Sequence, residues 1–350
     1  MGATTLAAGC ASGDAPATEA VERDSAGISI IENPRAIVEQ PAGWTVGGAP
    51  NLEIGVVEGE PSHQLFAVTG VGQLTDGRVV VLNAGTQEVR FYDAAGAFLR
   101  SVGGEGEGPG EYRFPDLAGI TLNDSIVVYD LMAARFTILD DRGRYARSVM
   151  APGLVAEAVG RFTSGRFVVS SGSASAGPDT PEGIIANEVR FLTLGADAAV
   201  RDTIAVAHGP LLFLAHVARR ISFTRVPFTA RPSGAVQGDF LHVTWGAAPE
   251  IRTFSADGRL IRIIRVQGPG EPVEDDDFAR VVERRVAEGD DPEEREELRR
   301  RYGEMRAPAI EPLFEGILVD RLGNVWARIF HEDGGPLVWT VFDRSGRGVG

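Results

Sequence analysis

The sequence predicts an all-β protein of the β-propeller class. Three observations carry this prediction: a short phrase recurs five times, each copy alternates apolar and polar residues, and most copies run into a tight glycine turn. The copies are EVRFYD, RFTILD, EVRFLT, EIRTFS and VWTVFD, which begin at residues 88, 135, 188, 250 and 338. Such a repeat indicates one supersecondary unit that is copied and stacked.

Each copy is expected to form one arm of a β-hairpin, because alternation of period two is typical of a strand. Four copies are followed by a turn with Asp or Ser first and Gly fourth: DAAG, DDRG, SADG and DRSG. Asp and Ser bond the backbone two residues on, and Gly supplies a positive φ. With a strand such as VVVLN upstream, a third strand downstream and one more before these, each unit holds four antiparallel strands.

The spacing of the copies indicates the size of the unit. The first two begin 47 residues apart, at Glu88 and Arg135, and a propeller blade spans about 40–50 residues. The later gaps are longer, and we interpret each as one blade plus an insertion. Radial repetition of four-stranded sheets leaves only short, protected edges.

Residues 103–149 contain a Gly-rich lead, an aromatic residue and a proline, a strand that ends in Asp, an arginine before the next strand, and Asp-x-x-Gly. This pattern resembles an NHL-type repeat. This resemblance implies a six-bladed β-propeller similar to the NHL and TolB-like families and to bacterial propeller lipoproteins of unknown function.

Five blades are visible in the sequence, from about Leu65 to Gly350. We expect residues 51–57 to form a lone strand before the first blade. Propellers commonly close by pairing an N-terminal strand into the last blade, and if residues 51–57 do so, the other strands of a sixth blade would follow Gly350. Either the sequence is truncated at its C-terminus, or the array closes imperfectly and leaves an exposed strand edge.

A helical hairpin is predicted at about residues 273–306, inserted between the fourth and fifth blades. Phe278, Val281 and Val282 follow helical spacing, and Asp291-Pro292 is a good N-cap with proline at the first helical position. A solvated surface insertion and a lid over the central channel both remain open, since long insertions in compact domains are often functional.

Composition limits the partners. The 350 residues carry a net charge of -15, which argues against nucleic acid and against an anionic membrane surface, because both require basic patches. All-β arrays routinely run long as one domain, so residues 25–350 are assigned to a single propeller domain. We expect a monomer whose partner is a protein or a glycan.

Cys10 is the only cysteine, which excludes an internal disulfide. The preceding LAAG and the small, polar stretch that follows resemble a bacterial lipobox. The resemblance implies lipidation at Cys10, with residues 1–24 as a signal remnant and disordered linker. The expected location is the periplasm or outer membrane, lipid-anchored or secreted, with the membrane contacted only through this anchor. The alternative is a chance cysteine in a disordered tail.

Aligning the copies by their turns places Asn83, Asp130 and Trp245 at equivalent positions. Equivalent positions of a propeller lie on one ring at the same face, and this ring could bind a polar ligand with Trp245 as a stacking platform. The competing interpretation is that Asp130 caps its own hairpin and Trp245 packs between blades.

No catalytic signature stands out in the sequence. The glycine run at residues 103–110 neither opens a helix nor precedes a lysine, there is no GxSxG motif, and the five histidines are scattered. We therefore expect a non-catalytic binding or protein-interaction module of the bacterial cell envelope, without a cofactor. The alternative is a metal-dependent lactonase, esterase or lyase that holds Ca²⁺ or Zn²⁺ at the central channel. The fold does not decide between them.

Overall fold

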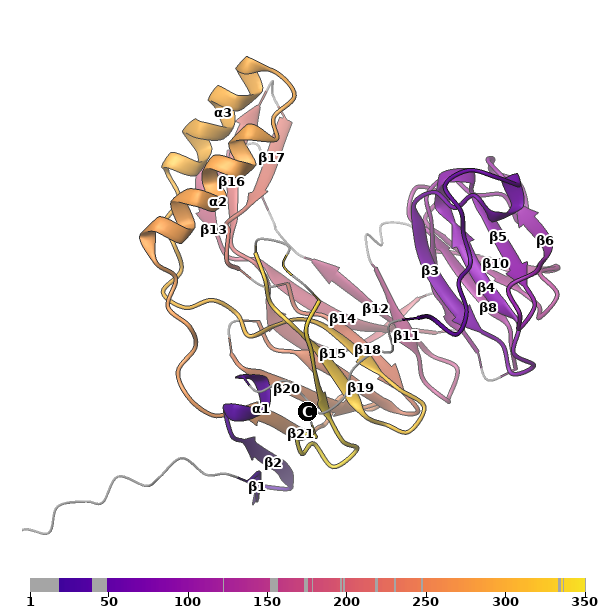
Figure 1. Ribbon diagram of the computed structural model, residues 1–350, viewed down its shortest axis with the longest axis horizontal. Helices are drawn as coiled ribbons and strands as arrows, with labels where there is room; N and C mark the ends of the chain where they lie inside the picture. Colours follow the sequence, from indigo (N-terminus) through magenta and orange to yellow (C-terminus); the bar gives the residue numbers. More distant parts are fainter. Residues whose placement is uncertain are drawn as a thin grey trace, which may run out of the picture.

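The protein is described by a computed structural model, and Figure 1 shows how its elements are arranged. The structure describes residues 19–39 and 49–349, apart from 122, 152–156, 173–175, 178, 196, 198, 218–219, 230, 247, 333–334 and 336. Cys10, the predicted lipidation site, lies outside the described residues. Within the described part of the chain, no helix is long and apolar enough to cross a membrane.

Five sheets follow the strand order of propeller blades, which confirms the predicted fold class. Blade 1 comprises β3 (Val68–Gln73), β4 (Val79–Asn83), β5 (Glu88–Tyr92) and β6 (Phe98–Gly103). Blade 2 comprises β7 (Pro115–Ile120), β8 (Ile126–Asp130), β9 (Arg135–Leu139) and β10 (Tyr145–Met150). Blade 3 comprises β11 (Glu157–Arg161), β12 (Phe167–Gly172), β14 (Glu188–Leu194) and β15 (Val200–His208). Blade 4 comprises β18 (Gly234–Gln237), β19 (Phe240–Thr244), β20 (Glu250–Ser255) and β21 (Leu260–Val266). Blade 5 comprises β22 (Phe314–Val319), β23 (Val325–Ile329) and β24 (Trp339–Phe342).

The repeated phrase forms the third strand of each blade, and its turn has the predicted chemistry. In blade 2, Oδ1 of Asp140 accepts hydrogen bonds from the backbone amides of Arg142 and Arg144, and Gly143 adopts a φ of +75°. Asp343 accepts the corresponding amides in blade 5. The side chain at the first position therefore organises the turn, and glycine supplies the left-handed backbone.

Neighbouring blades pack face to face through apolar side chains. Phe136 of blade 2 stacks on Phe167 of blade 3, with ring centroids 5.5 Å apart, and clusters of buried residues join blades 1 and 2, 3 and 4, and 4 and 5. Each fully buried large side chain contributes about 1.5–3 kcal/mol, so these interfaces hold the array together.

Blade 1 has a free face that a lone segment partly covers. Ile54 and Leu65 pack on its buried residues, and Oη of Tyr92 donates to the carbonyl oxygen of Ser62. Residues 51–57 form no strand and lie against blade 1, so the prediction of a lone strand there is wrong. They belong to a chain segment that shields apolar side chains of blade 1 from water, and η1 (Pro61–His63) lies in the same segment.

A different N-terminal segment joins the propeller sheet. The hairpin of β1 (Val21–Ser25) and β2 (Ile28–Asn33) extends blade 4 outward, with β2 parallel to β21. Asn33 is fully buried: its Nδ2 donates to the carbonyl oxygen of Gly346 at 3.0 Å, and its Oδ1 accepts from the amide of Gly348 at 2.7 Å. One amide side chain thus ties the N-terminal hairpin to the final turn of blade 5, beside α1 (Ala36–Glu39).

Two insertions far apart in sequence build one small α/β unit, which we call the insert module. It comprises β13 (Gly183–Ile185), β16 (Leu212–Val217), β17 (Arg220–Arg225), α2 (Asp275–Ala287) and α3 (Pro292–Gly303). The predicted hairpin is confirmed, and Oδ1 of Asp291 accepts from the amide of Glu294 at the start of α3. The helices cover the sheet through Val286 and Tyr302, which pack on Phe213. In Figure 1 the module stands at the opposite end of the molecule from blades 1 and 2.

A buried carboxylate fastens the insert module to blade 5. The Glu332 side chain is 1% exposed and follows β23. It accepts from Nη2 of Arg225 at 3.0 Å, from Nη2 of Arg285 at 3.1 Å and from the amide of Phe228 at 3.0 Å. Both insertions therefore meet a single group of the propeller.

The two ends of the propeller differ. One end carries the hairpin turns of every blade, and we call it the turn face. The other end carries the connections between second and third strands and between blades, and we call it the loop face; η2 (Ala84–Thr86) lies there. β12, β15 and β21, which lead into the insert module, all end at the loop face.

Candidate functional site

A hollow of about 580 Å³ opens at the turn face, where the inner hairpin turns of four blades meet. Each contributing turn joins the first and second strand of its blade. The lining residues are Ile120, Thr121, Asn123, Arg161, Phe162, Thr163, Ser164, Gly165, Val236, Gln237, Gly238, Val319, Asp320 and Arg321. We call this the turn-face hollow. No residue in this lining comes from the insert module, so among the described residues the helical hairpin does not act as its lid.

Regular turn chemistry holds the walls in place. In blade 3 the amide of Gly165 donates to the carbonyl oxygen of Phe162, and Gly165 adopts a φ of +91°. In blade 5 the amide of Gly323 donates to Asp320 in the same way. Because the turns close their own hydrogen bonds, the side chains between them project from a rigid edge.

The carboxylate in the lining is already engaged. Asp320 accepts hydrogen bonds from the amides of Leu322 and Asn324 and from the side chains of Asn324 and Trp326, at 2.8–3.1 Å. Burial opposes ionisation, but these donors outweigh it and lower the pKa of Asp320. Asp320 is therefore a charged structural group of its turn and has little capacity to bind anything else.

Two guanidinium groups in the lining lack such partners. Among the described residues, no carboxylate lies within ion-pair distance of Arg161 or Arg321. Nε of Arg161 donates to the carbonyl oxygen of Gly165 at 2.8 Å, and its guanidinium carbon lies 5.3 Å from the ring centroid of Phe167. Burial and the positive charge of Arg147 lower the pKa of Arg161. Arg321 donates to the Gln73 amide oxygen at 3.4 Å.

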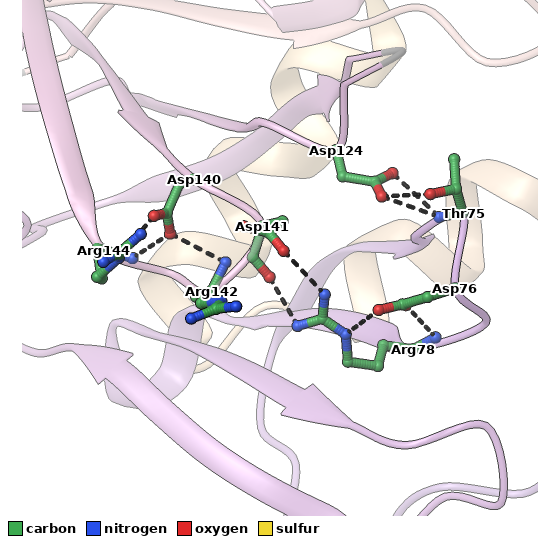
Figure 2. Close-up of polar contacts among 8 residues, drawn as sticks. All are labelled: Thr75, Asp76, Arg78, Asp124, Asp140, Asp141, Arg142 and Arg144. Carbon is green, nitrogen blue, oxygen red and sulfur yellow. Dashed lines mark hydrogen bonds and ion pairs between the residues drawn. The ribbon is translucent and has the colours of Figure 1, made fainter.

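Elsewhere on the turn face, polar residues latch neighbouring blades together, and Figure 2 shows the latch between blades 1 and 2. The Asp124 carboxylate accepts from the amide and the hydroxyl of Thr75. Arg78 bonds both Asp76 and Asp141. Every charge in this latch has a partner, so the cluster is structural.

The same latch recurs between blades 3 and 4. The amide of Thr163 donates to Oδ1 of Asp239 at 3.1 Å, and Nη2 of Arg166 donates to the carbonyl oxygen of Ala256 at 2.6 Å. Thr163 and Arg166 occupy the positions that Thr75 and Arg78 hold in blade 1. The repeat therefore fixes one wall of the turn-face hollow through blade-to-blade hydrogen bonds.

Asn83 and Asp130 lie at the loop face, opposite the turn-face hollow. Both side chains are fully buried. Oδ1 of Asn83 accepts from the amide of Phe66 at 2.6 Å, and Asp130 accepts from the amides of Arg113 and Phe114 at 2.7 and 3.2 Å. Each residue thus holds the chain that enters its own blade, and the two positions are structurally equivalent.

Trp245 also lies at the loop face, where its amide donates to the carbonyl oxygen of Glu250. Its ring packs against Phe254, and the guanidinium carbon of Arg252 lies 3.9 Å from the ring centroid. The capping bond of this blade comes from Thr244, whose hydroxyl accepts from the amide of Ser233. The ligand-binding role of Asn83, Asp130 and Trp245 stays a prediction.

No group of three or more metal-ligating side chains occurs among the described residues. The residues of the turn-face hollow were missed by the sequence argument, which aligned the outer turns. Aligning the inner turns instead provides a signal, since Arg161 precedes the turn of blade 3 and Arg321 lies within that of blade 5.

Comparison with known proteins supports the fold. The family DUF5128, described as a 6-bladed β-propeller, matches residues 66–148, which span blades 1 and 2. No curated protein matches the sequence.

Solved structures are similar over most of the chain at low identity. A Bacteroides fragilis protein, provisionally named as exported, shares 10% identity, covers 90% of this chain and 77% of its own, and has a TM-score of 0.51. A Bacteroides caccae protein of unknown function shares 12% identity, covers 80% of this chain and 78% of its own, and has a TM-score of 0.40. A Xanthomonas campestris gluconolactonase shares 12% identity, covers 81% of this chain and 75% of its own, and has a TM-score of 0.39. The first of these supports the propeller fold.

Proposed function

We propose that this protein is a ligand-binding module of the bacterial cell envelope that binds its ligand in the turn-face hollow without converting it. The observation that carries the proposal is the convergence of four inner turns on a hollow of about 580 Å³. A hollow of this size suits a small molecule or the end of a glycan, and a few fixed polar groups suffice to orient it.

Binding without conversion is favoured by the chemistry of the lining. Hydroxyl, amide and guanidinium groups donate hydrogen bonds and provide no general base, and the carboxylate of Asp320 is held by four donors. Guanidinium groups stay protonated in proteins. Such a wall recognises a ligand but offers no group poised to take a proton from it.

A location in the periplasm or at the outer membrane accompanies this proposal, with a monomer that is secreted or anchored through Cys10. The similarity to a protein provisionally named as exported is in line with this location. The insert module at the loop face leaves the turn face open, so an envelope glycan or a protein-borne group could reach the hollow.

The experiment is a ligand-observed NMR screen of small envelope-type molecules, both neutral and charged, against the full chain. The wild type is compared with Ser164→Trp, which fills the hollow from an exposed turn position. Ala95→Trp is the matched control, since Ala95 is exposed on an outer turn of the same face and does not line the hollow.

We expect hits that bind the wild type and the Ala95→Trp variant but not Ser164→Trp, and that stay chemically unchanged during overnight spectra. Hits that persist in Ser164→Trp would place binding elsewhere and refute the proposal. Conversion of a hit, abolished by a chelator, would favour the metal-dependent lactonase, esterase or lyase instead.

A further inference from the structure

We infer that the turn-face hollow selects ligands that carry an anionic oxygen group, and that Arg161 and Arg321 bind this group. The inference rests on the proposed function and names its ligand class. Hydroxyls and amides of the same lining, such as those of Thr121, Ser164 and Gln237, suit a hydroxylated anion.

The two arginines place positive charge in the turn-face hollow. Acidic residues outnumber basic ones by 49 to 34 in the chain, and many of its arginines form ion pairs with carboxylates. On the same face Arg78 is paired with Asp76 and Asp141. Arg161 and Arg321, by contrast, reach only neutral oxygens in the described part of the chain. The lining holds these two guanidinium groups against one carboxylate, that of Asp320, and a net positive charge in a recess attracts an anion.

Arg161 is already oriented for this role. Its Nε is occupied by the carbonyl oxygen of Gly165, and the guanidinium lies against the Phe167 ring. The hydrogen bonds described for it leave both Nη atoms available. A Cβ at position 165 would lie 2.7 Å from Nη2, so glycine is required for the guanidinium to lie here. A fixed guanidinium loses little entropy when it binds a carboxylate or phosphate with two bonds.

Arg321 brings a second charge from another blade. It lies in the β22–β23 turn, is exposed, and holds Gln73 through one long bond of 3.4 Å. A neutral amide competes weakly with an anionic oxygen, because charge-assisted hydrogen bonds are about twice as strong as neutral ones. An anion in the hollow would therefore draw Arg321 toward the ligand.

The test uses isothermal titration with matched probes: galactose, galacturonate and galactose 1-phosphate. The two anions differ from galactose by a carboxylate and a phosphate, so they distinguish the two sources of anionic oxygen. Proteins are the wild type, Arg161→Gln, Arg321→Gln and the control Arg142→Gln, which removes an exposed arginine from the same face. Thermal melts verify that each variant is folded.

At least one anion is expected to bind more tightly than galactose, and Arg161→Gln is expected to weaken it by about 10- to 100-fold. Arg321→Gln should weaken it less, and Arg142→Gln should have no effect. Added salt should lower the affinity of the anion and not that of galactose.

Equal affinity for galactose and both anions, or equal losses in Arg161→Gln and Arg142→Gln, would overturn the inference. If neutral ligands then bind the wild type but not Ser164→Trp, the proposed function still holds. If Ser164→Trp binds every ligand as well as the wild type does, whatever the ligand's charge, then both the proposed function and this inference fail.

Discussion

Removal of the Glu332 carboxylate is expected to loosen the insert module while the blades stay folded. The carboxylate is 1% exposed and accepts hydrogen bonds from three donor groups, two of which are arginine side chains. Breaking a buried ion pair costs about 3–5 kcal/mol. Arg225 and Arg285 are 37% and 35% exposed and can turn to water, so we expect Glu332→Ala to cost about 3 kcal/mol, at the lower end.

The assay is native-state hydrogen exchange read by mass spectrometry. A loss of about 3 kcal/mol in the free energy of local opening corresponds to roughly 100-fold faster exchange in α2 and α3. Glu288→Ala is the matched control, because Glu288 contacts the same Arg285 at 3.9 Å but is 58% exposed, and such pairs contribute about 0–1 kcal/mol. Equal exchange in both variants would refute the assignment of Glu332 as the anchor.

Two further predictions concern the blades. Asn33→Ala should lower the free energy of unfolding by about 2 kcal/mol in urea, because it removes the side-chain partner of the buried Gly346 carbonyl and of the half-buried Gly348 amide; a change below about 0.5 kcal/mol would contradict this. Burial and the charge of Arg262 lower the pKa of His242 to about 4. Because the unfolded pKa is near 6.5, stability should fall by about 3 kcal/mol as the pH drops from 6.5 to 4, and His242→Leu should lose this component. An unchanged pH profile in the variant would exclude His242 as its source.

The repeat predicted the blades well because its residues act locally. The turn at Asp140 needs only a side-chain acceptor and a glycine three residues on, and both are visible in sequence. Alternation within the phrase sets which side chains face the neighbouring blade. These local preferences agree with the folded structure, so the strand positions and turns could be predicted from the sequence.

The insert module could not be predicted as a unit. Its helices were visible from their spacing and the Asp291 cap. The sheet beneath them comes from residues 183–225, and nothing local links the two. Their union depends on Phe213 meeting Tyr302 and on Glu332 meeting Arg285, contacts between segments far apart in sequence. The sequence also did not show which N-terminal segment joins a propeller sheet. Packing decides this, because β2 pairs with blade 4 whereas residues 51–57 lie against blade 1.

In the candidate site, too, local features could be predicted and long-range ones could not. Alignment correctly placed Asn83 and Asp130 on one face, but their side-chain oxygens accept hydrogen bonds from backbone amides. The hollow lies at the other face, where Arg161 and Arg321 come from turns more than 150 residues apart in sequence. Which arginines lack a carboxylate partner depends on the whole charge arrangement, and sequence spacing does not reveal it.

The most direct test of the central claim is a crystal structure of the protein soaked with the tighter of galacturonate and galactose 1-phosphate. The account predicts the ligand in the turn-face hollow, with its anionic group within hydrogen-bond distance of Nη atoms of Arg161 and with Arg321 turned from Gln73 toward the ligand. Density for the ligand at the loop face near Trp245, with the turn-face hollow empty, would contradict it.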